Sequence, residues 1–325
     1  MKKSKLSNAL AAFACMGSLC LSAGAQDAST SNALRIGSGP QGKVYELLVR
    51  DMQAVCGAEV PIVNVSSIGG IPNLMMLSAS QADLGIVQLD TLREMGRDGD
   101  ENIQTLQAVM PLHINLLHVL ALRDGSKVGE ARVGETKVPF SGDLRVIKKF
   151  SELKGAKVAV VGSTMLLGQK LNTQWKLGMD LRVAESDDDA LKMLKDNKVQ
   201  AIFTDGGWPL PSIARHKTDS GLVLVEYDEP VQAPFSIVKR NYQNLSAFNV
   251  PFLGSPNVLV TRPFKPNGDM GKRVAALQSC LLKHLEELQE GRFHAAWKEI
   301  KNPQDTLGVP RFTRIESPKK NANAK

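Results

Sequence analysis

The stretch that decides the fold is residues 34–45, which read LRIGSGPQGKVY. It predicts a short apolar strand, a glycine-rich turn and the start of a helix over residues 43–56. Glycines let the backbone bend sharply and approach a ligand closely, and the helix start directs free N–H groups and positive dipole charge into the turn. Such a corner suits a carboxylate or phosphate, although many corners carry glycine for geometry alone.

The same strand–turn–helix pattern recurs downstream. Residues 61–65 predict a second strand, residues 66–73 a polar turn with Gly69 and Gly70, and residues 82–88 a third strand. Successive units of this kind are typical of a parallel α/β sheet, in which ligands collect beyond the carboxyl ends of the strands. Both glycine turns and the end of the third strand lie at that edge, so three loops converge on one site.

The second half repeats this architecture without repeating the sequence. The remaining expected elements are strands over 106–110, 116–122, 157–161, 181–184, 199–204, 221–227 and 257–261, helices over 73–80, 187–195 and 270–288, and a turn over 162–164 that leads into a helix through Trp175. The strand over 257–261 is expected to cross back to the first half. Residues 123–145 are polar and glycine-bearing and predict a linker or loop. The tail after Arg314 is expected to be disordered.

The N-terminal residues predict a signal peptide over residues 1–25, with a basic start, a short apolar run and the cleavage signal Ala23-Gly24-Ala25. Without its three lysines the net charge of +7 falls to +4, and no basic stripe is interleaved with aromatics, so we expect no nucleic-acid partner. We also expect no cofactor and no metal. Cys56 and Cys280 fall on helical patterns, where buried free thiols are the expected state and a disulfide is the alternative.

Several motifs occur in the order of one family. They are Ile36-Gly37-Ser38-Gly39 with Gly42 and Tyr45, Gly69-Gly70 with Asn73-Leu74, residues 81–88 with Asp90, His118, residues 153–158, residues 200–203, Gly206-Gly207 and Pro209. Over nearly the whole mature chain the sequence resembles TAXI-type solute-binding proteins, the extracytoplasmic receptors of one branch of TRAP transporters. It departs from the family pattern at Pro40-Gln41, at residues 161–165, which lack a second glycine, and at residues 124–143, which look like an insertion.

The resemblance implies an α/β fold of the type II periplasmic-binding-protein kind, with two α/β lobes and a ligand cleft between them. We expect lobe I to comprise residues 26–122 and 257–325, and lobe II residues 123–256. Family ligands are small amino acids such as glutamate and dicarboxylates such as 2-oxoglutarate. The implied protein is a monomeric periplasmic receptor that passes a small anionic solute to the permease subunits of a TRAP-type transporter.

Polar and glycine residues at the strand ends are the expected ligand contacts. In the first lobe these are Ser38, Gly39, Gln41, Tyr45, Ser67, Gly69, Gly70, Asn73, Gln88 and Asp90, and in the second Ser163, Thr164, Asp205, Gly206 and Trp208. Asp90 suits a ligand ammonium or a cap, and Trp208 is expected to cover an apolar part of the ligand. We expect Ser38, Gly70, Gln88, Ser163 and Gly206 to face one cavity.

Other residues have simpler expected roles. His113 and His118 are interpreted as core or hinge histidines, and residues 187–189 as a solvated helix start. The alternative function is a sensory binding protein that docks on a membrane receptor. An enzyme on the same fold is less favoured, because Ser163 has no base visible in the sequence and no paired carboxylates stand out.

Overall fold

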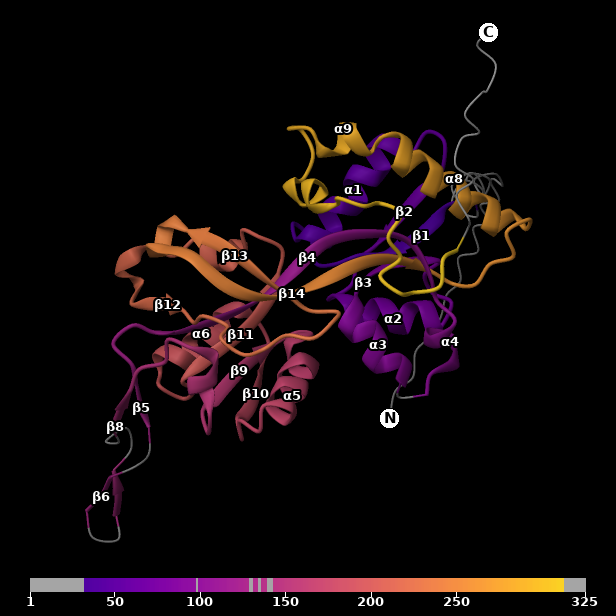
Figure 1. Ribbon diagram of the computed structural model, residues 1–325. Coiled ribbons are helices and arrows are strands. Elements are labelled where there is room, and N and C mark those ends of the chain that lie inside the picture. Colours follow the sequence, from indigo (N-terminus) through magenta and orange to yellow (C-terminus); the bar gives the residue numbers. More distant parts are fainter. Residues whose placement is uncertain (1–31, 98, 129–130, 134–135, 139–142, 313–325) are drawn as a thin grey trace, which may run out of the picture. The chain divides into compact units, whose positions relative to one another are not determined.

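The computed structural model describes residues 32–97, 99–128, 131–133, 136–138 and 143–312 (Figure 1). The predicted signal peptide and the predicted disordered tail lie outside these residues. The chain divides into two units, Met1–Ala33 and Leu34–Lys325, and the fold below is that of the second. Over the described residues, no helix combines the length and the apolar character needed to cross a membrane.

A ten-stranded sheet organises this unit, in the order β10-β9-β11-β4-β14-β3-β1-β2, with β12 added to β4 and β13 to β14. The strands are β1 Leu34–Gly37, β2 Ile62–Val65, β3 Leu84–Gln88, β4 Gln107–Leu122, β9 Lys157–Val161, β10 Asp180–Ala184, β11 Ala201–Gly206, β12 Leu222–Leu224, β13 Ser236–Tyr242 and β14 Ala247–Thr261. β1 pairs in parallel with β2 and β3, and β9 pairs in parallel with β10 and β11. These two parallel sets confirm the predicted α/β class.

Strands β4 and β14 are antiparallel to each other and lie between the two sets (Figure 1). β4 also pairs with β11 through residues 116–121, and β14 also pairs with β3 through residues 257–261. The prediction of two strands around Pro111 is wrong, because β4 continues through this residue. Its partner β14 shifts register between Pro256 and Val258, opposite Pro111, and such an irregularity accommodates a residue without an N–H.

The helices follow the strands on both faces of the sheet. They are α1 Val44–Cys56, α2 Gly70–Ser78, α3 Leu89–Arg97, α4 Glu101–Gln104, α5 Thr164–Gln174, α6 Asp187–Lys195, α7 Pro211–Ala214, α8 Asp269–Lys283 and α9 Leu285–Gln289, with 3₁₀ turns at 150–153, 218–220, 243–245 and 295–299. The expected single helix over 270–288 is wrong: at His284 the backbone leaves the helical region, with φ −102° and ψ 14°, and α9 begins after it.

Residues 123–145 contain short strands instead of the expected loop. β5 Ser126–Val128 pairs with β8 Asp143–Arg145, and β6 Ala131–Val133 pairs with β7 Thr136–Val138, both antiparallel. Backbone pairing within the segment satisfies peptide groups that a loop would leave to water.

The core follows the alternation of side chains along each strand. Leu84 and Ile86 of β3 pack with α1 and α8, whereas Val87 packs with α2 and α3. In the second set, Phe203 of β11 packs with α5, and Ile202 packs near α6 and α7. Each parallel set is therefore covered by helices on both faces.

Cys56 at the end of α1 and Cys280 in α8 form a disulfide, so the expectation of free thiols is wrong. The two sulfurs close a loop whose ends are 224 residues apart in sequence. Both helices pack on the same face of β1 and β3, which brings the two cysteines together inside that cluster. The sequence pattern gave each helix but not their adjacency.

Candidate functional site

A cavity of about 230 Å³ lies where the turns after β1, β2, β9 and β11 meet. Side chains of β4 and of the start of α6 complete its wall. Its lining residues are Gly39, Pro40, Gly42, Lys43, Val44, Tyr45, Leu47, Ile68, Gly69, Gly70, Asn115, Val161, Gly162, Ser163, Asp187, Thr204, Asp205, Gly206, Gly207, Pro209, Leu210, Pro211 and His294. Both parallel sets therefore contribute to one small, mostly apolar chamber with a few polar groups, as ligand sites do.

Three helices begin at this cavity without a side-chain cap. The residues before α1, α2 and α5 are Lys43, Gly69 and Ser163, and none of them caps its helix with its side chain. Gly69 has φ +133°, a conformation that side-chain-bearing residues rarely adopt. Because these three side chains do not cap their helices, the first N–H groups of the helices can donate to an anion placed at the cavity wall.

Asp205 is a carboxylate at the end of β11 with neutral partners. Gln88 Nε2 donates to its Oδ2 at 2.6 Å, and Ser163 Oγ lies 3.1 Å from both of its oxygens. Burial raises the pKa of Asp205 to about 6, and the nearby charges of Asp90 and Asp187 act in the same direction. The hydrogen bonds from Gln88 and Ser163 oppose this rise but do not cancel it.

Lys43 and Asp187 form the ion pair of the cavity. Lys43 Nζ lies 3.7 Å from Asp187 Oδ2, which joins the start of α1 to the start of α6. Thr204 Oγ1 donates to the other oxygen of Asp187 at 2.7 Å. Residues 187–189 were interpreted as a solvated helix start, and this is wrong for Asp187, which lines the cavity.

His294 enters the cavity wall from the segment after α9. Its Nδ1 accepts a hydrogen bond from Ala296 N at 3.1 Å, and burial lowers its pKa below the ordinary value of 6.5. The imidazole is therefore neutral at pH 7, so the lining contributes one ammonium, of Lys43, and two carboxylates.

A buried polar network joins side chains of α1, β4 and β14 at the cavity wall. Tyr45 Oη donates to Asn257 Oδ1, and Asn115 Nδ2 donates to Tyr45 Oη at 3.3 Å. Asn115 Oδ1 lies 2.9 Å from His113 Nε2. Burial raises the pKa of Tyr45 well above its usual value of 10, so the phenol stays neutral. The network joins α1 to both long strands.

His113 and His118 are core histidines, as predicted. They are 1% and 0% exposed, and burial lowers the pKa of each to about 3. His118 Nε2 lies 2.8 Å from Tyr242 Oη. Neither side chain lines the cavity.

The fifteen expected contacts divide into two groups. Those that line the cavity are Gly39, Tyr45, Gly69, Gly70, Ser163, Asp205 and Gly206. Those that do not are Ser38, Gln41, Ser67, Asn73, Gln88, Asp90, Thr164 and Trp208. Of the five residues expected to face one cavity, Gly70, Ser163 and Gly206 do so, whereas Ser38 and Gln88 do not.

Several residues of the second group hold the turns together. Ser38 Oγ donates to Asn64 Oδ1 at 2.5 Å, and Ser67 Oγ donates to the Ser38 carbonyl at 2.9 Å. Asn73 Nδ2 donates to that carbonyl and to the Ile86 carbonyl, at 2.7 and 2.8 Å. These side chains fix the two glycine turns against each other and against β3, so they shape the cavity from behind.

Other residues of the second group bond to other parts of the chain or face water. Thr164 Oγ1 donates to the Val161 carbonyl, and Asp90 accepts from Ser255 Oγ. Gln41 is exposed. The Trp208 indole donates to the Asn241 carbonyl at 3.1 Å and lies against the Arg240 guanidinium, so it packs on β13.

Residues that the sequence pattern missed include Lys43, Asn115, Asp187 and His294. Lys43 directly follows the glycine turn, which is a usable signal for a cation near an anion site. Asn115 lies inside an apolar strand and His294 is distant in sequence, so only the fold brings them to the cavity.

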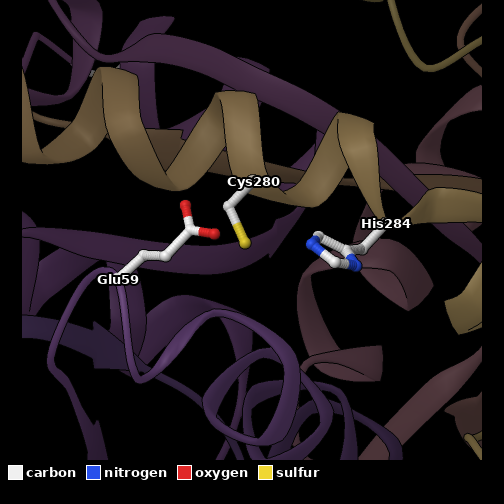
Figure 2. A group of neighbouring side chains, drawn as sticks. All are labelled: Glu59, Cys280 and His284. Atoms are coloured by element: carbon white, nitrogen blue, oxygen red, sulfur yellow. The ribbon is translucent and has the colours of Figure 1, made fainter.

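A separate group of side chains has ligand atoms close enough for a metal. Atoms of Glu59, Cys280 and His284 lie within 4.8 Å of one another (Figure 2). The sulfur of Cys280 is bonded to Cys56, however, so it is not a thiolate. His284 Nδ1 also lies 2.9 Å from Glu287 Oε2. In its disulfide form this group lacks the ligand that a zinc site of this kind requires.

No protein-family model matches the chain, and a search of curated proteins finds no significant relative. Solved structures with a similar arrangement include an amino acid ABC transporter substrate-binding protein from Streptococcus pneumoniae bound to L-arginine, with 14% identity, TM-score 0.48, and coverage of 87% of this chain and 97% of that one. Another is the GluR0 ligand-binding core with L-glutamate, with 14% identity, TM-score 0.44, and coverage of 77% and 94%.

Proposed function

We propose that this chain is a solute-binding receptor that captures a small carboxylate in the cavity and does not alter it chemically. The observation that carries the proposal is the convergence of three uncapped helix starts, those of α1, α2 and α5, on one cavity of about 230 Å³. Their N–H groups and dipoles favour an anion. A chamber of this volume suits a molecule the size of an amino acid or a small dicarboxylate.

The proposed lobes give this binding a mechanism. Lobe I comprises residues 26–122 and 257–325, lobe II comprises residues 123–256, and β4 and β14 cross between them. A ligand that touches turns of both lobes favours the closed arrangement by its differential contacts, and closure removes it from water. The Lys43–Asp187 pair already joins the two lobes at the cavity wall.

The proposed site of action is the periplasm, where the receptor passes its ligand to the permease subunits of a TRAP-type transporter. The family resemblance of the sequence supports this partner. Ser163 supports binding over acyl chemistry, because its hydroxyl faces the Asp205 carboxylate and not an imidazole.

The test is a calorimetric and thermal-shift screen of the full chain against amino acids and dicarboxylates, with mass spectrometry of co-purified ligand. In Gly70→Leu the new Cβ meets only Gln88 N at 3.6 Å and Val87 Cα at 3.8 Å, which is ordinary contact, and the larger side chain takes up space at the cavity wall that Gly70 lines. We expect this variant to fold and to lose ligand binding. Gly291→Leu, a control at a position with open space, retains binding.

A Gly70→Leu variant that binds the same ligand with unchanged affinity contradicts the proposal. Turnover of the bound compound by the wild-type protein contradicts it as well.

A further inference from the structure

The two carboxylates that line the cavity have different partners. Asp187 is paired with Lys43 and hydrogen-bonded by Thr204. Asp205, by contrast, accepts hydrogen bonds from neutral side chains, those of Gln88, Ser163 and Asn115, and no cation of the described residues is among the groups that act on it. A carboxylate that lines a ligand cavity without a cationic partner is a place for a cationic group of the ligand.

From this imbalance we propose that Asp205 binds an ammonium group of the ligand, so that the site takes an α-amino acid in preference to its 2-oxo analogue or a dicarboxylate. This inference rests on the proposed function and narrows its ligand class. The carboxylate of the amino acid lies at the uncapped helix starts, and its ammonium lies at the carboxyl end of β11.

The groups around Asp205 favour a ligand ammonium beside it and disfavour a second negative group of the ligand. The negative groups that act on it are Asp90, held by Ser255, and Asp187. Tyr45, which also faces this region, is neutral. A second anion here adds repulsion, whereas an ammonium replaces the water that Asp205 loses on closure.

The comparison of an amino acid with its 2-oxo analogue isolates this contact. The two molecules share a carboxylate and a side chain, but the analogue presents a carbonyl oxygen where the amino acid presents three N–H donors. When the carbonyl oxygen of the 2-oxo analogue faces Asp205, the Asp205 carboxylate receives no hydrogen bond from the ligand. A site that depends on this hydrogen bond binds the analogue more weakly by about 100-fold or more.

The experiment is titration calorimetry on the full chain with matched pairs: glutamate with 2-oxoglutarate, alanine with pyruvate, and the remaining amino acids with their 2-oxo acids. We expect at least one amino acid to bind about 100-fold more tightly than its partner. Asp205→Asn weakens that amino acid by a similar factor, whereas Asp180→Asn, an exposed aspartate on β10, does not.

The outcomes separate the two proposals. A 2-oxo acid or dicarboxylate that binds as tightly as the matching amino acid, or an Asp205→Asn variant with unchanged amino-acid affinity, overturns the ammonium site and leaves the receptor function standing. Failure of every acid to bind the wild-type protein overturns the receptor function and the ammonium site together.

Discussion

Replacing Asp205 by Asn is expected to stabilise the ligand-free protein at pH 7. A carboxyl group with a pKa of about 6 in place of 3.8 carries an unfavourable free energy on the order of 3 kcal/mol when it is ionised. An Asn oxygen at the Oδ2 position still accepts from Gln88 and Ser163, but these bonds no longer end on an ion and are weaker, which offsets about 1 kcal/mol. The net gain is about 2 kcal/mol, or roughly 4 °C in Tm for a chain of this size.

The pH dependence of this gain follows from the direction of the shift. Since the folded pKa lies above the unfolded value, the folded state holds the proton between about pH 4 and pH 6 while the unfolded state has lost it. The wild-type protein therefore loses stability as the pH rises through this window. The penalty is complete above pH 6 and absent below pH 3.8.

The assay is urea unfolding of wild-type protein, Asp205→Asn and the control Asp180→Asn at pH 7.5 and pH 4. We expect the gain of Asp205→Asn at pH 7.5 only, and a change of less than about 1 kcal/mol in the control, whose carboxylate forms an exposed ion pair with Arg182. A variant less stable than wild type at pH 7.5, or a gain of equal size at pH 4, refutes the claim that the ionised Asp205 carboxylate destabilises the folded protein. The same variant is predicted to bind the amino acid more weakly. If the variant is also more stable than wild type, misfolding does not explain the weaker binding.

Two further predictions concern the disulfide and the pH dependence of binding. Cys56→Ser opens the cross-link to Cys280 and is expected to lower the free energy of unfolding by about 2–5 kcal/mol, measured in urea; wild type treated with a reductant should lose a similar amount, and an unchanged unfolding midpoint contradicts this. Amino-acid affinity is expected to fall as the pH drops below about 6, where Asp205 gains a proton. Calorimetry from pH 5 to pH 8 checks this, and a constant affinity across that range contradicts it.

The sequence predicted those elements whose signals are local. The helix over 187–195 and the strand over 157–161 occur at the predicted bounds, because a polar N-cap region and a compact apolar run each mark their own limits. Gly39 and Gly69 both line the cavity, because parallel strands bring their carboxyl ends to one edge.

The features that were missed depend on long-range contacts. Pro111 interrupts an apolar run in sequence, but the register shift of β14 opposite it lets β4 continue. Ser38 directly precedes Gly39, which lines the cavity, yet the Ser38 hydroxyl donates to Asn64 on the neighbouring strand. Which of two adjacent polar side chains faces a ligand depends on partners that a single sequence does not identify.

A crystal structure of the full chain with the amino acid that binds best tests the central claim most directly. We predict ligand carboxylate oxygens within hydrogen-bond distance of backbone N–H groups at the starts of α1, α2 or α5, and the ligand nitrogen within the same distance of Asp205. A ligand seated outside this cavity, or one that touches only lobe I or only lobe II, contradicts the account.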